Sequence, residues 1–152
     1  MKESLPAEKF YHLLKHRPPM TWVESVISAR EEEGQFFGEC QVSLSKTALY
    51  LQGGTGGPSG ASAIEFCAQA YGFSRACYQE MNNIDFNPTQ TYLSSISRCK
   101  TSFHGFDPEA EDHLRIKVQT KRVTHPLVFI NGQVYGSSGR LYAELSFALY
   151  LA

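Results

Sequence analysis

The sequence predicts one α+β domain in which a curved antiparallel sheet wraps around a single long helix. Three observations support this fold class. Residues 61–81 are apolar nearly all round a helix, which is typical of a buried helix. The stretch from Phe36 to Leu44 alternates apolar and polar side chains, as a half-buried strand does. Several β-prone segments follow the helix, and together they could cover it.

The composition predicts an ordinary globular protein rather than a nucleic-acid or membrane protein. The chain has 152 residues, which fit a single domain spanning residues 1–152, and a formal net charge of −1. Its basic residues are scattered, with Lys121 and Arg122 as the only adjacent pair, so a polyanion is an unexpected partner. No apolar run approaches the roughly 20 residues needed to cross a bilayer.

Location and cysteine usage follow from the same features. The first residues, Met1–Ser4, lack the apolar core of a signal peptide, so we expect a cytoplasmic protein. The four cysteines do not have the C-x-x-C spacing of zinc or redox sites. We expect them to be buried thiols that act as small hydrophobic side chains.

The elements before the long helix are expected to be one short helix and two strands. Apolar residues at helical spacing place the helix at Ala7–His16, and Pro18 and Pro19 end it. Thr21–Ser28 is rich in β-formers and reads as a strand, followed by a polar turn at Glu31–Gly34. The second strand, Phe36–Leu44, leads to a glycine-rich loop at Gln52–Gly60.

The chain after the helix is expected to form four or five antiparallel strands. The candidate strands are Thr91–Ile96, His113–Thr120, Leu127–Ile130 and Leu141–Leu151. Asn131-Gly132 predicts a hairpin turn, Gly136–Gly139 a turn or bulge, and Asp107–Glu109 a further turn. An open sheet leaves edges that need covering, so we also expect dimerisation.

The start of the long helix is the candidate chemical site. A glycine-rich loop before a helix offers free backbone N–H groups at the positive end of the helix dipole. The loop lacks the G-K-[ST] ending of a phosphate-binding P-loop, and no basic residue occurs between Thr47 and Phe73. This N-terminus therefore suits the oxygen of a polarised carbonyl better than a phosphate.

Glu65 is a carboxylate about one turn into this apolar helix, and Gln69 lies one turn further on the same face. A carboxylate among apolar neighbours is costly unless it is paired, hydrogen-bonded or protonated. It could serve as a catalytic acid or base, or it could simply cap loop amides. Ser59 is expected to be the N-cap residue rather than a nucleophile, because the G-x-S-x-G pattern is absent.

Residues 59–70, with the sequence SGASAIEFCAQA, resemble the central-helix motif of the hotdog-fold 3-hydroxyacyl-(acyl carrier protein) dehydratases. That motif reads H-F-x-G-x-P-x-M-P-G-x-x-x-x-[ED]-x-x-x-Q. Residues 14–20, LKHRPPM, resemble the family's L-P-H-R-x-P-F/M entry motif. The resemblance covers almost the whole chain and is closest to the divergent dehydratase subunits of aryl polyene biosynthesis.

The resemblance implies a role for each matching residue. Glu65 takes the place of the family's catalytic acidic residue, Gly60 that of the glycine whose amide polarises the thioester carbonyl, and Gln69 that of the helix glutamine. We therefore expect Gly60 and Gln69 to contact substrate. The substrate would be an acyl thioester on acyl carrier protein or coenzyme A, with no metal or cofactor. In the loop, the match is Gly54, and the replacements are Pro58 for methionine and Ser59 for proline.

The family's catalytic histidine would fall on Leu51, so a different base is needed for a complete reaction. His16 is the leading substitute, because the entry motif lies close to the substrate tunnel in the hotdog fold; it could equally fix the turn before Pro18. His12 lies one turn before His16, which also allows a metal pair. The other histidines, His104, His113 and His125, are expected on the surface or in strands.

Three functions fit these features. The first is dehydration of 3-hydroxyacyl thioesters in fatty acid or polyene-type biosynthesis. The second is an acyl thioesterase of the same fold, in which Glu65 activates water. The third is a non-catalytic subunit that pairs with an active dehydratase. We expect either a homodimer or a heterodimer with a related hotdog subunit.

Overall fold

The computed structural model describes residues 4–12, 22–44, 58, 60–85, 91–103, 106–107 and 110–151. These ranges form one long helix, α2 (Gly60–Met81), and a seven-stranded sheet with the order β1-β2-β3-β5-β6-β7-β4. Every pair of neighbouring strands in this sheet is antiparallel. The other elements are β1 (Leu5–Pro6), the 3₁₀ helix η1 (Ala7–Phe10), β2 (Val23–Glu32), β3 (Gln35–Ser43), β4 (Thr91–Thr101), β5 (His113–Thr124), β6 (Leu127–Gly136) and β7 (Leu141–Leu151).

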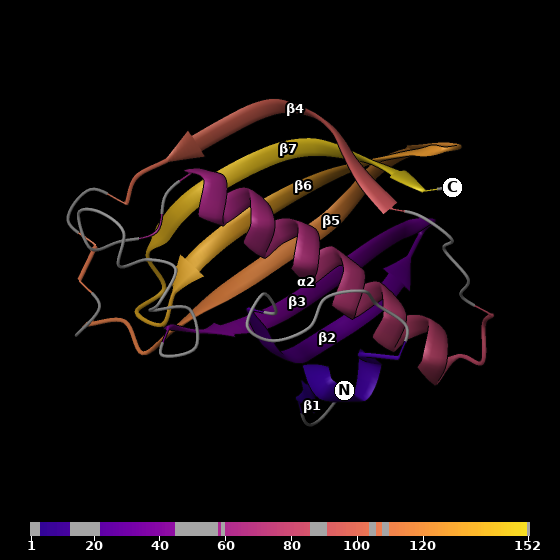
Figure 1. Ribbon diagram of the computed structural model, residues 1–152, viewed down its shortest axis with the longest axis horizontal. Coiled ribbons are helices and arrows are strands. Elements are labelled where there is room, and N and C mark those ends of the chain that lie inside the picture. Colours follow the sequence, from indigo (N-terminus) through magenta and orange to yellow (C-terminus); the bar gives the residue numbers. More distant parts are fainter. Residues whose placement is uncertain are drawn as a thin grey trace.

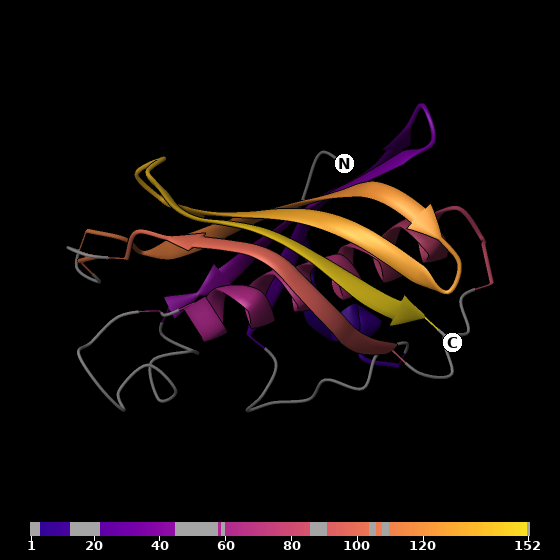
Figure 2. The same ribbon diagram turned by 90° about the horizontal axis from the view of Figure 1, so that it is seen from above.

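The sheet curves around α2, which crosses its strands diagonally (Figure 1). Seen from above, the helix lies along one face of the sheet, and the hairpin of β2 and β3 extends beyond the other strands (Figure 2). The predicted fold class, a curved antiparallel sheet wrapped around one long helix, is therefore confirmed. Among the described helices, none has both the length and the apolar character needed to cross a membrane.

Two glycines in the sheet allow α2 to pack closely against it. A Cβ atom on Gly132 of β6 would lie 2.6 Å from the Cys67 sulfur, and one on Gly38 of β3 would overlap the Ser74 side chain. Neither position leaves room for a Cβ atom, so only glycine permits this close approach. Cys67 and Ser74 are seven positions apart in the chain, which places them on the same face of the helix. That face is the one turned toward the sheet.

The predicted hairpin turn at Asn131-Gly132 is wrong. Both residues lie inside β6, where Asn131 is opposite Gln119 of β5 on one side and Ser146 of β7 on the other. The Asn-Gly pair has the chemistry of a turn, but the glycine is required here by the Cys67 contact rather than by a chain reversal. The turn predicted at Gly136–Gly139 is present and joins β6 to β7.

Several predicted boundaries also shift. β2 continues through Glu32, and the turn consists of Glu33 and Gly34, both with positive φ. The first helix is the short η1, which ends at Phe10 and is followed by a turn through His12; the rest of the predicted Ala7–His16 helix and Ser59 lie outside the described residues. β4 and β5 extend beyond their predicted ends, to Thr101 and Thr124.

Three cysteines behave as predicted and one does not. Cys40, Cys67 and Cys77 are buried, and all four cysteines are free thiols. Burial raises the pKa of each of these three thiols, to about 11 for Cys77, which keeps them protonated and unreactive near neutral pH. Cys99 is exposed, because it lies on β4 at the edge of the sheet.

A buried carboxylate joins the end of the β4–β5 connection to the β6–β7 turn. Glu111 is only 2% exposed. It accepts hydrogen bonds from the hydroxyl groups of Ser137, Ser138 and Tyr142 and from the backbone N–H of Ser138. Burial by itself would raise the pKa of Glu111, but these four hydrogen bonds outweigh it and lower the pKa to about 2. The Tyr142 ring also stacks on Phe103, at 5.6 Å between centroids.

The variant Glu111→Gln should lower the free energy of unfolding at pH 7 by on the order of 3 kcal/mol, the value of the pKa depression. Because the folded-state pKa lies below the unfolded one, this stabilisation is complete above about pH 4.5 and is lost as the pH falls toward 2. Urea unfolding of both proteins from pH 7 to pH 2.5 measures this difference. A deficit in the variant that does not shrink as the pH falls would contradict the prediction.

Candidate functional site

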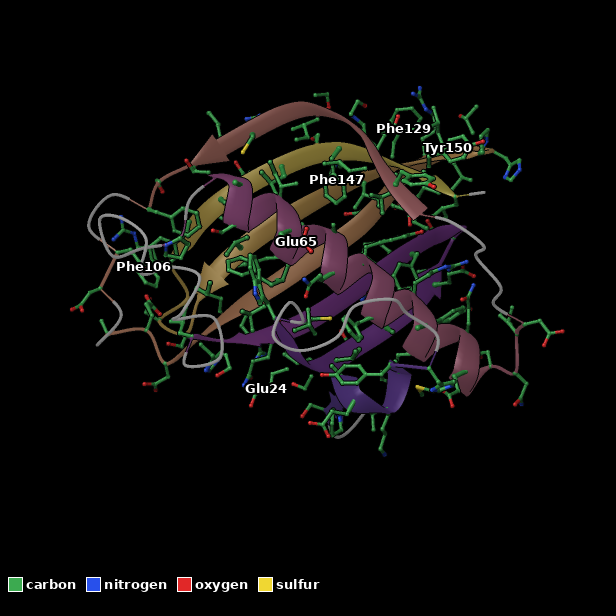
Figure 3. All side chains as sticks on the ribbon, in the orientation of Figure 1. Glu24, Glu65, Phe106, Phe129, Phe147 and Tyr150 are labelled. Atoms are coloured by element: carbon green, nitrogen blue, oxygen red, sulfur yellow. The ribbon has the colours of Figure 1, made fainter. Side chains whose placement is uncertain are left out.

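Glu65 lies on the N-terminal half of α2 and points away from the sheet. It precedes Cys67 by two residues, a rotation of about 200° around the helix, and Cys67 faces the sheet. Figure 3 shows Glu65 on the part of α2 that lies in front of the strands. Its side chain is half-buried. The carboxylate is therefore held at the outer side of the helix, where a ligand can reach it.

Gln69 links this carboxylate to the start of β2. Its side-chain nitrogen Nε2 donates a hydrogen bond to Glu65 Oε1 at 2.8 Å. Its side-chain oxygen Oε1 accepts hydrogen bonds from the backbone N–H of Trp22 at 2.8 Å and of Val23 at 3.4 Å. Gln69 is 1% exposed, so these bonds form in a region shielded from water. In this structure Gln69 orients Glu65, and its predicted contact with substrate stays a prediction.

Aromatic packing around Gln69 keeps the start of β2 against the helix. The Trp22 and Phe66 rings meet edge to face with centroids 5.3 Å apart. Trp22 is 8% exposed, and Phe66 is fully buried. Such pairs contribute about 0.5–1.5 kcal/mol beyond the apolar area that they bury. Because this packing and the amide of Gln69 hold the same backbone, Glu65 is fixed relative to two elements.

Gly60 is the first residue of α2, where backbone N–H groups have no partner within the helix. A Cβ atom there would lie 3.6 Å from the Cys99 sulfur and 3.8 Å from Thr101 Cγ2 of β4. The glycine is half-buried beside the C-terminal end of the edge strand β4. The helix start, Glu65 and the inner face of β4 therefore lie in one region.

The described histidines lie elsewhere. His12 Nε2 is 4.0 Å from Glu80 Oε1, and Glu80 is about 22 Å along the helix from Glu65 at the usual rise per residue. His113 alternates with the buried Leu114, so it faces the side of the sheet opposite α2. His125 lies in the turn between β5 and β6. The predicted catalytic residue His16, together with Leu51, Gly54 and His104, is outside the described residues.

Sequence reasoning missed the exposed inner surface of β4. Its inward positions follow from the register, because Leu93 is opposite Leu149 and Ile96 is opposite Phe147. The two β7 residues are buried, whereas Leu93 and Ile96 are 47% and 42% exposed. Leu93 and Ile96 are three residues apart, and a β-bulge between them is what brings both side chains to the same face of the strand. A spacing of three is not that of two residues on one face of a regular strand, so the sequence does not indicate this shared surface.

Comparison with known protein families assigns the chain to one of them. The model of the ApeP-like family, described as ApeP dehydratase, matches residues 8–147. This protein belongs to the ApeP-like dehydratase family. It is therefore a dehydratase-like protein, and the resemblance drawn from its helix and entry motifs is confirmed. A search of curated proteins finds no match.

Solved structures support the hotdog fold. The dehydratase heterocomplex ApeI:P from Xenorhabdus doucetiae has a TM-score of 0.74 and 18% identity, covering 99% of this chain and 93% of that chain. The dehydratase domain of RzxB from Pseudomonas fluorescens has a TM-score of 0.65 and 11% identity, covering 99% and 50%. A putative thioesterase, yhdA from Lactococcus lactis, has a TM-score of 0.60 and 8% identity, covering 90% and 97%. At these identities the likeness establishes the fold alone.

Gln69→Leu should lower the free energy of unfolding by about 1–3 kcal/mol, because the backbone N–H of Trp22 loses a buried acceptor. The matched control is Gln41→Leu, which removes a partly buried amide bonded to Glu24 and should change stability by under about 0.5 kcal/mol. Urea unfolding measures both. Equal effects of the two substitutions would show that Gln69 is not a structural link.

Proposed function

We propose that this protein works in the dehydration of 3-hydroxyacyl thioesters and that Glu65 is its acid–base residue. The observation that carries the proposal is the hydrogen bond from the buried Gln69 amide to Glu65 Oε1, which fixes the orientation of a half-buried carboxylate on the outer side of α2. Membership of the ApeP-like dehydratase family supports the reaction class. An acyl carrier protein or coenzyme A as the thioester carrier, and a cytoplasmic location, are part of the proposal.

The reaction sets the requirements of the site. Elimination breaks the C2–H bond and the C3–O bond, forms the C2=C3 double bond and releases water. One group must accept the C2 proton and another must protonate the departing hydroxyl. In this proposal Glu65 handles the hydroxyl proton, and the Gly60 N–H donates to the thioester carbonyl, where negative charge develops. The positive end of the helix dipole stabilises that charge.

The remaining requirement is a base for the C2 proton. His12, His113 and His125 lie away from Glu65, as described above, and Leu51 stands where the family motif has histidine. His16 remains our candidate within the chain. A histidine from a second subunit is the other source, which would make the site complete only in an oligomer.

We propose that a second hotdog subunit pairs with β4. Every described side chain from Tyr92 to Thr101 is exposed, and among the described strands β4 is hydrogen-bonded to β7 alone. A long edge strand with exposed apolar side chains normally requires cover. The solved relative ApeI:P is a heterocomplex of dehydratases, which supports a related but different chain as the partner.

Activity of Glu65→Gln tests the catalytic role. The glutamine keeps the shape of the side chain but cannot transfer a proton, so the rate of enoyl thioester formation should fall at least about 100-fold. The control is Glu80→Gln, an exposed carboxylate on the same helix, which should retain full activity. Ultraviolet absorbance of the enoyl product from a 3-hydroxyacyl thioester gives the rate, with the chain assayed alone and with a co-purified hotdog dehydratase.

The same assay separates the alternatives. Free thiol without enoyl product would indicate a thioesterase and overturn the dehydratase assignment. Full activity of the complex with Glu65→Gln would indicate a non-catalytic subunit whose partner performs the whole reaction. Loss of activity in Glu80→Gln as well would point to a folding defect and would contradict a specific role for Glu65.

The edge-pairing proposal has its own test. Ile96→Asp places a charge on the exposed inner face of β4 and should shift the assembly toward monomer, with at least about tenfold weaker association. Light scattering and native mass spectrometry give the oligomeric state. Val123→Asp is the control, because Val123 is also an exposed apolar residue (62%) but lies at the end of β5. Unchanged assembly of Ile96→Asp would exclude β4 as the interface.

A further inference from the structure

A groove lies on the face of the sheet opposite α2 and is separate from the Glu65 region. Its volume is about 480 Å³, and residues of β2, β3, β4, β5, β6 and β7 line it. Two of the lining residues are Gly38 and Gly132, where the helix packs closest to the sheet. The sheet can approach the helix there because no side chain intervenes, and the groove lies directly behind these two contacts. The hairpin of β2 and β3 rises beside this face (Figure 2).

A row of directly opposed residues crosses all six strands along the groove. Opposed residues of antiparallel strands share a face of the sheet, so their side chains all project from this side. Neighbouring strands lie about 4.8 Å apart, which makes the row roughly 24 Å long. In order from β2 to β4, the row is Arg30, Phe37, Gln119, Asn131, Ser146 and Arg98.

Two of the three amide side chains that line the groove have their oxygens already bonded, whereas the third, Gln119, donates its own amide N–H to a neighbouring side chain. Asn131 Oδ1 accepts a hydrogen bond from the Ser146 hydroxyl at 2.9 Å. Gln133 Oε1 accepts one from the Tyr135 hydroxyl at 3.1 Å. With the oxygens engaged, the amide N–H groups of both residues are the parts available to a ligand. Asn131 and Gln133 therefore present amide donors to the groove, and these favour a ligand rich in hydrogen-bond acceptors.

The charged residues leave the groove with excess positive charge. Of its acidic residues, Glu39 is hydrogen-bonded to Arg115 at 3.3 Å, and Glu144 is opposite Lys100. Three lining cations, Lys117, Lys121 and Arg98, form no ion pair with any described residue. This concentration is unexpected in a chain whose net charge is −1. Charge complementarity therefore selects an anion.

These cations can act on one ligand. Lys117 and Lys121 flank Gln119 along β5, and Gln119 is opposite Asn131. Arg98 lies two strands from Asn131, a separation of about 10 Å that its long side chain largely spans. We propose that the groove binds a small multivalent oxyanion, a phosphate- or carboxylate-bearing metabolite. Lys117, Lys121, Arg98 and the Asn131 amide N–H hold it. The volume is that of a typical small-molecule site.

Calorimetric titration with pyrophosphate and with citrate tests this site, at low ionic strength so that the charges are weakly screened. Asn131→Asp keeps the acceptor for Ser146 but replaces the donor with a negative charge, so it should weaken binding at least about tenfold. Lys121→Ala should weaken binding about fivefold. The control is Lys9→Ala, which lowers the net charge equally on exposed η1 and should leave affinity unchanged.

Each outcome decides the proposal. Binding of pyrophosphate alone identifies a phosphate ligand, and binding of citrate identifies a carboxylate ligand; both support the site if Asn131→Asp weakens them selectively. Failure of both anions to bind, equal binding by Asn131→Asp, or equal weakening by Lys9→Ala would overturn it. Binding of hexaglutamate without either small anion would also overturn it, in favour of an acidic protein segment. Circular dichroism of each variant confirms that the fold is retained.

Discussion

The close packing of α2 against the sheet is the constraint on which the rest of the structure depends. The helix is apolar nearly all round, so it is stable only when the sheet curves around it. Gly38 and Gly132 let the two layers meet without intervening side chains at Ser74 and Cys67. This contact also decides the rotation of the helix about its axis. Once Cys67 faces the sheet, Glu65 must face away from it.

Placing the Glu65 carboxylate in a half-buried position costs free energy, and hydrogen bonds offset this cost. The half-buried Glu65 carboxylate accepts a hydrogen bond from the Gln69 side chain. Gln69 can itself be buried because its side-chain oxygen accepts hydrogen bonds from the backbone N–H groups of Trp22 and Val23. One amide side chain therefore fixes a strand and orients the Glu65 carboxylate at the same time. A hydrogen-bond acceptor or donor alone could not do both, which explains why glutamine suits this position.

The two faces of the sheet carry different kinds of side chain. The face toward α2 forms the core, and its uncovered part at β4 exposes apolar side chains, which is what the proposed interface with a second subunit requires. The opposite face carries polar and basic side chains, and the depression beneath the helix contacts gives them a common space. At one end of the sheet, Glu111 accepts hydrogen bonds from Ser137 and Tyr142 and so links the connection between β4 and β5 to the β6–β7 turn.

The sequence by itself determined the fold class, the long helix and Glu65 with Gln69 as a pair on one helix face. These features depend on local periodicity, which the order of residues specifies directly. Only the tertiary structure decided that Asn131-Gly132 belongs to a strand, because the contact between Gly132 and Cys67 joins distant parts of the chain. The same holds for the bond between Gln69 and Trp22, for the basic groove and for the exposed edge of β4. Each depends on which strands become neighbours, and local residue patterns do not encode that choice.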